Sequence, residues 1–325
     1  MEKKRVIIIP SYLTLNVNWS IIFVMIVKLK PALKSYLWGG KNLKTQYGKV
    51  SNQDTVAESW ELSFNPVGPS VIDSGEHCGR LLADVVTKCD LGANVNAFAD
   101  FPVMVKLIDS AQNLSVQVHP SDDYALKNEG QYGKTEVWHI LNVGADAFIY
   151  LGLNKNVTEQ ELSSALKNGT VCSLLNKIPV HRGETYFIEA GTIHAIGAGV
   201  TLAEIQQNST LTYRLYDFDR VDADGNKRPL HIEKALKVAA LNKYEISNTV
   251  KDGLLCKCKY FSAYRYNGDG TVGRDDSFVS VTVIDYEMEL NGLVLKKGET
   301  AFLSSGEHAS ITGNGSYILV CVEKE

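Results

Sequence analysis

The chain has 325 residues, of which 45% are hydrophobic, and a formal net charge of −4. This composition is typical of a soluble globular protein long enough for two domains, and the mild acidity without a clustered basic face argues against a nucleic-acid-binding protein. The six cysteines have neither zinc-knuckle nor disulfide-framework spacing, so we expect a protein of the reducing cytoplasm.

The first 24 residues differ in character from the rest of the chain. A basic start is followed by apolar residues, which Pro10, Asn16 and Asn18 interrupt. No uninterrupted apolar stretch approaches the roughly 20 residues that a membrane helix needs, and no clear small-residue cleavage site follows. We therefore expect no membrane span here, and a genuine anchor is the alternative.

The chain then alternates in the manner of β-strands, with glycine and proline between the segments. The strand-like segments are VKLKPAL, ESWELSF, MVKLID and SVQVH. Trp38 and Trp60 could line a cavity or only fill a core. Between these segments, GEHCGRLLADVV (75–86) predicts a helix on the outside.

The SVQVH segment carries the first candidate metal ligands. Gln117 and His119 share one face of this strand, which the following proline should end. We predict a short helix after it, capped by Ser121 and ended by Gly130.

The next strand, KTEVWHIL, places Lys134 and Glu136 on one face. His194 follows a glycine-rich turn at Gly191, and with the polar side chains of the two strands it would complete a ligand set. Neutral imidazole with carboxylate suits zinc or another divalent transition metal, whereas oxygen alone suits magnesium or calcium. The alternative is a buried histidine and glutamate that only satisfy each other.

Later segments are read in the same way. TEQELSSALKNG (158–169) predicts a helix with a capping box that covers the β-structure. LAEIQQ and LTYRLYDF predict two strands paired around a polar turn at 208–210. RPLHIEKALKVAAL (228–241) predicts an amphipathic helix. In the last part, KGETAFLSSGEHASITG echoes RGETYFIEAGTIHAIGAG, but no equivalent ligands precede its histidine, His308.

Several of these motifs resemble known families. QVHP, GKTEVWHIL and GETYFIEAGTIHAI are similar to the two half-motifs of the cupin β-barrel. More closely, the chain resembles the short bacterial form of type I mannose-6-phosphate isomerase (phosphomannose isomerase). The similarity runs from Met25 to the C-terminus and includes LWGG, ESWELS and EIQQNSTLTYRLYDFDR.

The resemblance implies a mainly β fold, with a cupin-type (jelly-roll) β-barrel that carries a helical insertion and a second, smaller cupin-like barrel at the C-terminus. We expect a catalytic domain at 25–242 and a C-terminal domain without a metal site at 243–325. Residues 1–24 are then a non-native extension from a misassigned start codon, and Met25 is the functional start.

The implied activity is the interconversion of D-mannose 6-phosphate and D-fructose 6-phosphate through a cis-enediolate. The implied cofactor is one Zn²⁺ per chain. Its ligands would be Gln117, His119, Glu136 and His194, with Gln117 in place of the more usual histidine. The ion would act as a Lewis acid toward the substrate oxygens.

Resemblance and strand faces together give the remaining site residues. Lys134 and Glu204 are the candidates for acid–base catalysis. Arg214 matches the active-site arginine of the family and could hold the enediolate or the phosphate. Ser115, Lys134 and Arg214 are candidates for substrate binding. Thr210 stands where long-form relatives carry an aspartate, which weakens any mechanism that relies on a carboxylate at that position.

Two other classes of function remain open from the sequence. A non-catalytic cupin could bind a sugar or a metal, and a cupin dioxygenase could use two histidines and a glutamate to hold iron. Lys134, Glu204 and Arg214 favour the isomerase, because an oxygenase has little use for a phosphate anchor. For partners we expect a small phosphosugar, no nucleic acid and no membrane, with a monomer or weak homodimer in the cytoplasm.

Overall fold

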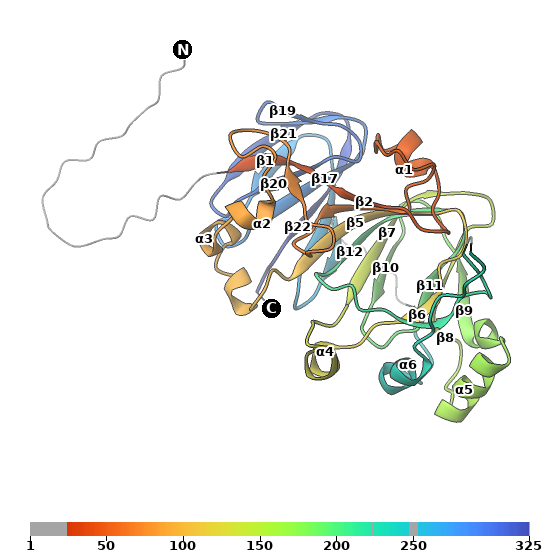
Figure 1. The fold of residues 1–325 in the computed structure, drawn as a ribbon. Coiled ribbons are helices and arrows are strands. Elements are labelled where there is room, and N and C mark those ends of the chain that lie inside the picture. Colours follow the sequence, from red (N-terminus) through yellow and green to blue (C-terminus); the bar gives the residue numbers. More distant parts are fainter. Residues whose placement is uncertain (1–24, 223, 247–252, 325) are drawn as a thin grey trace, which may run out of the picture.

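Figure 1 shows the computed structural model, which describes residues 25–222, 224–246 and 253–324. The predictions made for residues 1–24 therefore lie outside the described residues. Within the described part, 22 strands form four antiparallel sheets, accompanied by a few short helices. The prediction of a mainly β fold is confirmed. The strand pairings of the described residues give four open sheets and no closed barrel.

Two of the sheets carry the candidate ligands. Sheet I has the strand order β13-β6-β11-β8-β9, and sheet II has the order β10-β7-β12-β5-β3-β2. The strands of sheet I are β6 (Val116–Val118), β8 (Phe148–Leu153), β9 (Leu175–Pro179), β11 (His194–Ile196) and β13 (Tyr213–Tyr216). Those of sheet II are β2 (Ala32–Lys34), β3 (Glu58–Leu62), β5 (Val103–Ser110), β7 (Glu136–Val143), β10 (Thr185–Ile188) and β12 (Val200–Gln207).

The C-terminal part provides most strands of the other two sheets, and the N-terminal part adds β1 and β4 to one of them. Sheet III has the order β14-β15-β22-β17-β20-β1-β4, and sheet IV has the order β16-β21-β18-β19. Sheet III contains β1 (Ile26–Lys30), β4 (Val71–Ile72), β14 (Leu254–Lys257), β15 (Ser262–Asn267), β17 (Val279–Asp285), β20 (Thr300–Leu303) and β22 (Ser316–Cys321). Sheet IV contains β16 (Gly270–Gly273), β18 (Met288–Leu290), β19 (Leu293–Leu295) and β21 (His308–Thr312).

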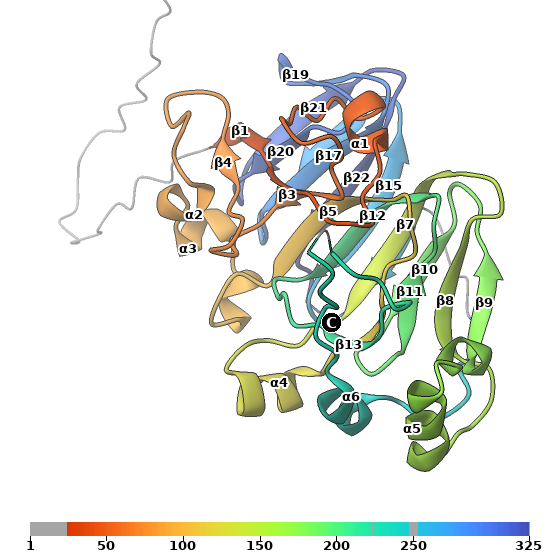
Figure 2. The ribbon, with the colours of Figure 1, turned by 45° about the vertical axis from the view of Figure 1, so that its right-hand side comes forward.

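The sheets stack in the order I, II, III, IV. Sheet II has apolar side chains on both faces: Leu202 of β12 joins a cluster shared with sheet I, whereas Ala203 and Ile205 join one shared with sheet III. This split follows from the alternation of side chains along a strand. A third cluster fills the space between sheets III and IV. Figure 2 shows the strands of sheets III and IV above those of sheets I and II.

Helices cover the outer face of sheet I and the connections between strands. They are α1 (Asn42–Thr45), α2 (Leu82–Val85), α3 (Lys88–Leu91), η1 (Val95–Ala97), α4 (Asp122–Glu129), α5 (Glu159–Lys167), η2 (Val171–Leu174) and α6 (Ile232–Val238). The apolar residues of α5 and α6 pack with those of β6 and β11 in a fourth cluster, on the side of sheet I away from sheet II. Figure 1 shows α4, α5 and α6 along this edge of the molecule.

Two of these helices confirm their predictions. Helix α4 begins after Ser121 and ends at Gly130, whose φ of 63° is left-handed, but the side chain of Ser121 makes no capping hydrogen bond. Helix α5 begins at a capping box in which Thr158 and Glu161 exchange side-chain and backbone hydrogen bonds. The predicted helix at 228–241 is present but shorter, as α6.

The helix predicted at 75–86 is wrong over most of its length, because only α2 forms. Gly75 and Gly79 adopt φ values of 71° and 90°, outside the helical region. The backbone N–H of Gly79 donates to the carbonyl of Ile72, and that of Ile72 donates to the carbonyl of Arg80. The segment is therefore a tight turn after β4.

The predicted pairing of the two strands around 208–210 is also wrong. Strand β12 pairs with β5 and β7, whereas β13 pairs with β6 in sheet I. Both edges of β12 are therefore occupied, and the polar segment 208–212 crosses from sheet II to sheet I. Among the described residues, no helix has the length and apolar character to cross a membrane.

Candidate active site

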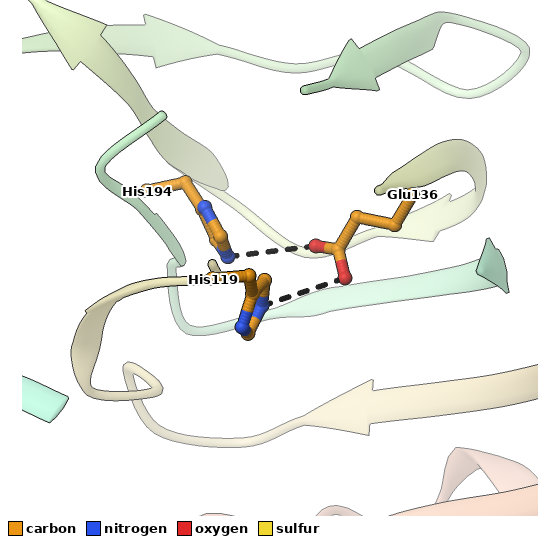
Figure 3. Close-up of side chains that lie close together, drawn as sticks. All are labelled: His119, Glu136 and His194. Atoms are coloured by element: carbon orange, nitrogen blue, oxygen red, sulfur yellow. Dashed lines mark ion pairs between the residues drawn. The ribbon is translucent and has the colours of Figure 1, made fainter. Parts of the chain in front are cut away.

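Three buried side chains converge between sheets I and II. His119, Glu136 and His194 are at most 1% exposed, and their candidate ligand atoms all lie within 4.8 Å of one another. Figure 3 shows each imidazole directed at a different oxygen of the carboxylate. The Nε2 atom of His194 lies 3.4 Å from Oε1 of Glu136, and the Nε2 atom of His119 lies 3.6 Å from Oε2.

The backbone explains why residues so far apart in sequence meet here. His194 opens β11, and its Cα pairs with that of Gln117 in β6. His119 lies just past the end of β6, where its carbonyl accepts the backbone N–H of Gly191 at 2.8 Å. Gly191 has a φ of 92°, so the turn before His194 needs glycine. Glu136 reaches the same point from the first residue of β7 in the facing sheet.

The protonation of both histidines suits a metal ligand. The Nδ1 atom of His119 lies 2.8 Å from the carbonyl of Leu211, and that of His194 lies 2.9 Å from the carbonyl of Thr192. Each carbonyl accepts the Nδ1 proton, which leaves the lone pair of Nε2 directed at Glu136. Burial lowers the pKa of His119 well below its usual range and that of His194 to about 4, so both imidazoles are neutral.

Unsatisfied polar atoms indicate that the group fits a metal ion. Oε1 of Glu136 and Nε2 of His194 are buried without a hydrogen-bond partner, which is costly unless a cation binds there. Burial also raises the pKa of Glu136 to about 7, as expected for a carboxylate placed in a dry site. Two neutral imidazoles with one carboxylate are a donor set of zinc or a similar transition metal.

The side chain of Lys134 lies against this group. Its Nζ atom contacts Oε2 of Glu136 and lies 3.2 Å from Nε2 of His119 and 3.8 Å from Oε1 of Glu204. The ammonium group therefore bridges the candidate metal ligands and the second carboxylate of the site.

The second carboxylate, that of Glu204, is held by its neighbours on the two adjacent strands of sheet II. Glu204 pairs in register with Trp138 on one side and with Lys106 on the other. Its side chain accepts hydrogen bonds from Lys106 Nζ at 3.1 Å and from Trp138 Nε1 at 3.0 Å. Burial raises the pKa of Glu204, but Lys134 and Lys106 outweigh burial and lower it to about 2, so this carboxylate is ionised.

Arg214 lies two strands from His194 in sheet I, because its Cα pairs with that of Gln117 in β6. Its NH1 group donates to the carbonyl of Pro229 at 2.8 Å, and its Nε atom is buried without a partner. Among the described residues, Arg214 forms no ion pair with the nearby carboxylates of Asp217 and Glu204. Burial and then the nearby Arg228 lower the pKa of the Arg214 guanidinium.

A cavity of about 440 Å³ opens above the buried group. It is lined by Lys34, Tyr36, Trp38, Glu58, Trp60, Val67, Lys106, Ile108, Leu114, Ser115, Gln117, Lys134, Glu204, Thr210, Thr212, Arg214 and Arg228. All the predicted site residues except the buried group of three therefore line one cavity. Trp38 and Trp60 contribute to its wall as well as to the core.

The comparisons identify the family. Residues 26–136 match the family model described as phosphomannose isomerase type I, catalytic domain. A putative mannose-6-phosphate isomerase of Bacillus subtilis is 33% identical over 292 residues, which cover 86% of this chain and 90% of that protein. A probable mannose-6-phosphate isomerase of the same organism is 35% identical over 303 residues, covering 90% and 92%. The chain belongs to the type I mannose-6-phosphate isomerase family.

Solved structures of mannose-6-phosphate isomerases share the fold. The crystal structure of the Bacillus subtilis enzyme has a TM-score of 0.80 and 31% identity, and the match covers 91% of this chain and 99% of that one. A zinc-bound mannose 6-phosphate isomerase has a TM-score of 0.74 at 19% identity, covering 92% of this chain and 100% of that one. The second likeness concerns the fold alone.

Two cavity residues of this family member were missed by the sequence analysis. Lys106 is 6% exposed in β5, where every other residue is also buried. A lysine in the middle of an apolar strand is the signal that could have identified it, because a buried ammonium group needs a partner. Arg228 was assigned to a helix, but it lies before α6 and lines the cavity.

Proposed function

We propose that this enzyme interconverts D-mannose 6-phosphate and D-fructose 6-phosphate. The observation that carries the proposal is the buried group of His119, Glu136 and His194 beneath a cavity lined by carboxylates and cations, in a member of this family. The reaction needs ring opening and then proton transfer between C1 and C2 through a cis-enediolate. A metal site next to paired acidic and basic side chains supplies what both steps require.

We propose one Zn²⁺ per chain, held by Gln117, His119, Glu136 and His194. The donor set and its two unsatisfied buried atoms support this choice. Gln117 is half-buried beside His194 and lines the cavity, so its amide oxygen is our candidate for a fourth ligand. The bound ion supplies Lewis acidity toward the substrate oxygens at C1 and C2.

Lys134 and Glu204 are our candidates for moving the proton. Nζ of Lys134 and Oε1 of Glu204 lie 3.8 Å apart at the cavity floor, close enough to serve one face of an enediolate. Because Glu204 stays ionised between two lysines, it can accept a proton, and Lys134 can donate one. Lys106 and Trp138 hold the carboxylate of Glu204 in place.

Arg214 and Ser115 are proposed to bind the substrate. The guanidinium of Arg214 has donors left over after its bond to Pro229, and these can stabilise the negative charge of the enediolate. Ser115 is 4% exposed at the start of β6 and lines the cavity, where its hydroxyl can contact a sugar oxygen. Lys134 contributes to binding as well as to proton transfer.

We also propose the finer domain organisation expected from the sequence. A catalytic cupin-type domain at 25–242 is supported by the way sheets I and II enclose the site. A cupin-like domain at 243–325 is supported by sheet IV and by five of the seven strands of sheet III, to which the N-terminal part adds β1 and β4. In the repeated motif, β10 and β11 lie in two different sheets, and so do β20 and β21. Within the described part, only His119, Glu136 and His194 form a group suited to a metal, which supports a C-terminal domain without one.

We further propose that the enzyme acts on its phosphosugar in the cytoplasm, as a monomer or weak homodimer. The six cysteines have neither zinc-knuckle nor disulfide-framework spacing, in keeping with a reducing compartment.

A coupled assay on mannose 6-phosphate tests the proposed function. Fructose 6-phosphate should form with the purified protein, a chelator should abolish its formation, and added Zn²⁺ should restore it. Unphosphorylated mannose is the control substrate and should be converted far more slowly. Full activity after complete metal removal would contradict the metal-dependent mechanism, and no turnover with any metal would contradict the isomerase.

A further inference from the structure

The positively charged side chains that line the cavity are balanced by carboxylates at one end of the cavity but not at the other. Five line it: Lys34, Lys106, Lys134, Arg214 and Arg228. Lys106 lies 3.6 Å from Glu58 and 3.1 Å from Glu204, and Lys134 contacts Glu136. Lys34 donates to the carbonyl of Val67 and lies 4.7 Å from the ring of Trp60. The floor of the cavity therefore has no surplus of positive charge.

The surplus lies at the other end, around Asp217. This carboxylate is 6% exposed and accepts hydrogen bonds from Arg220 at 2.5 Å and from Arg228 at 2.7 and 2.6 Å. Both arginines lie close enough to Arg214 for their positive charges to lower its pKa. Arg214 itself forms no ion pair with a carboxylate in the described part of the chain. Three guanidinium groups thus face one carboxylate, and two positive charges remain uncompensated.

Arg228 and Arg220 form different hydrogen bonds with Asp217. Arg228 binds it through Nε and NH2, which fixes the plane of its guanidinium, while the side chain stays 29% exposed and lines the cavity. Arg220 binds it through NH2 and donates its NH1 to the carbonyl of Asn113, away from the cavity lining. Of these two arginines, Arg228 is therefore the one that presents an oriented donor edge to a ligand, with an NH1 group that makes no hydrogen bond to the described residues.

We propose that Arg228, oriented by Asp217, binds the phosphate monoester of the substrate. This inference rests on the proposed function and deepens it. A phosphate dianion matches the two uncompensated charges, and a planar guanidinium with a free edge suits its oxygens. Arg214 and His194 lie in one cross-strand row, two strand spacings or roughly 10 Å apart. The phosphate would then lie beyond Arg214, opposite the reacting carbons C1 and C2.

The kinetic test compares Arg228→Met with Arg220→Met. Both variants remove one ion pair with Asp217, but only the first changes the cavity. A phosphate anchor remote from the reacting carbons contributes mainly to binding. Arg228→Met should therefore raise KM for mannose 6-phosphate about 10- to 100-fold with kcat nearly kept, since bonds to charged groups have this strength. Arg220→Met should raise KM far less than Arg228→Met, because it removes a nearby positive charge but no donor of the cavity lining. Arg228→Lys should restore part of the affinity.

Titration with inorganic phosphate separates this inference from the proposed function. The Kd for phosphate, measured by calorimetry on the zinc-loaded protein, should rise at least tenfold in Arg228→Met and much less in Arg220→Met. This result would support the anchor even if the unaltered protein showed no turnover. Equal KM and Kd values in the two variants, or a loss in kcat alone, would overturn it.

Discussion

Arg214 lies between the buried histidines and the proposed phosphate end, with a buried Nε that has no partner. If its guanidinium holds the enediolate, it acts mainly in the transition state. Arg214→Ala should therefore lower kcat on the order of 10²–10³-fold, as deletion of one oxyanion donor does, and raise KM much less. Steady-state kinetics on mannose 6-phosphate measure both constants.

Metal content and melting temperature are the controls for Arg214→Ala. Both should stay close to those of the unaltered enzyme, because Arg214 has no ion pair among the described residues and its bond to Pro229 is local. Near-normal turnover, or inactivity that only follows unfolding, would remove Arg214 from the catalytic residues.

Lys106 tests how strongly the buried charges of the site depend on one another. Lys106→Met leaves Glu58 and Glu204 without this cation, and breaking a buried pair in this way costs about 3–5 kcal/mol. The free energy of unfolding, measured by urea titration, should fall by that amount. In the control, Lys155→Met removes an exposed pair with Glu161 and should cost at most about 1 kcal/mol. Equal losses in the two variants would show that Lys106 does not stabilise the buried carboxylates.

Sequence alone identified the buried group at the level of residue types. His119, Glu136 and His194 are residue types typical of a metal site. Glu136 begins a strand, His119 directly follows one and His194 follows a glycine-rich turn, so all these signals are local. Lys106 and Arg228 were missed because their roles depend on neighbours 98 and 11 residues away in the chain. A lysine in an apolar strand indicates that a partner is needed, but no local pattern identifies which residue that partner is.

At the level of elements, the turn at Gly133, between α4 and β7, sets the distance between His119 and Glu136. A Cβ atom on Gly133 would lie 2.6 Å from the carbonyl oxygen of Pro120 and the carbonyl carbon of Ser121. Gly133→Ala should therefore push Glu136 away from His119. We expect zinc affinity to fall about 10- to 100-fold, as it does when groups that support metal ligands are altered.

Competition with a zinc indicator measures the affinity, and Gly130→Ala is the matched control. Gly130 has a φ of 63° but open space around its added Cβ. Its replacement should cost about 1–2 kcal/mol of stability and leave zinc affinity unchanged. Unchanged zinc affinity in Gly133→Ala would show that this turn does not set the spacing.

Elements with strong local signals were predicted correctly, and those decided by sheet order were not. The caps of α4 and α5 lie within a few residues of each helix, so the sequence reveals them. The pairing of β13 depends on whether β12 has a free edge, and β5 and β7 occupy both. The fold at 75–86 depends on two glycines with positive φ and on pairing with β4.

At the scale of the whole molecule, sheet II is held between sheet I and sheet III, so the site rests on a layer packed on both faces. A buried ion pair of Lys49 and Glu61 at 2.6 Å strengthens this contact, because Lys49 also donates to the carbonyl of Gly298 and Glu61 accepts from Thr300 of sheet III. The C-terminal sheets thus support the site without contributing a candidate metal ligand from the described residues.

The zinc content of His119→Ala tests the central claim, that the buried group holds the metal on which turnover depends. The control is His139→Gln. His139 is a buried histidine of β7 that is hydrogen-bonded to Thr185 and lies outside the group. After zinc loading and dialysis, elemental analysis should find one zinc per chain in the unaltered protein and in His139→Gln. His119→Ala should have lost its zinc together with its turnover of mannose 6-phosphate. Stoichiometric zinc and normal turnover in His119→Ala would contradict the account.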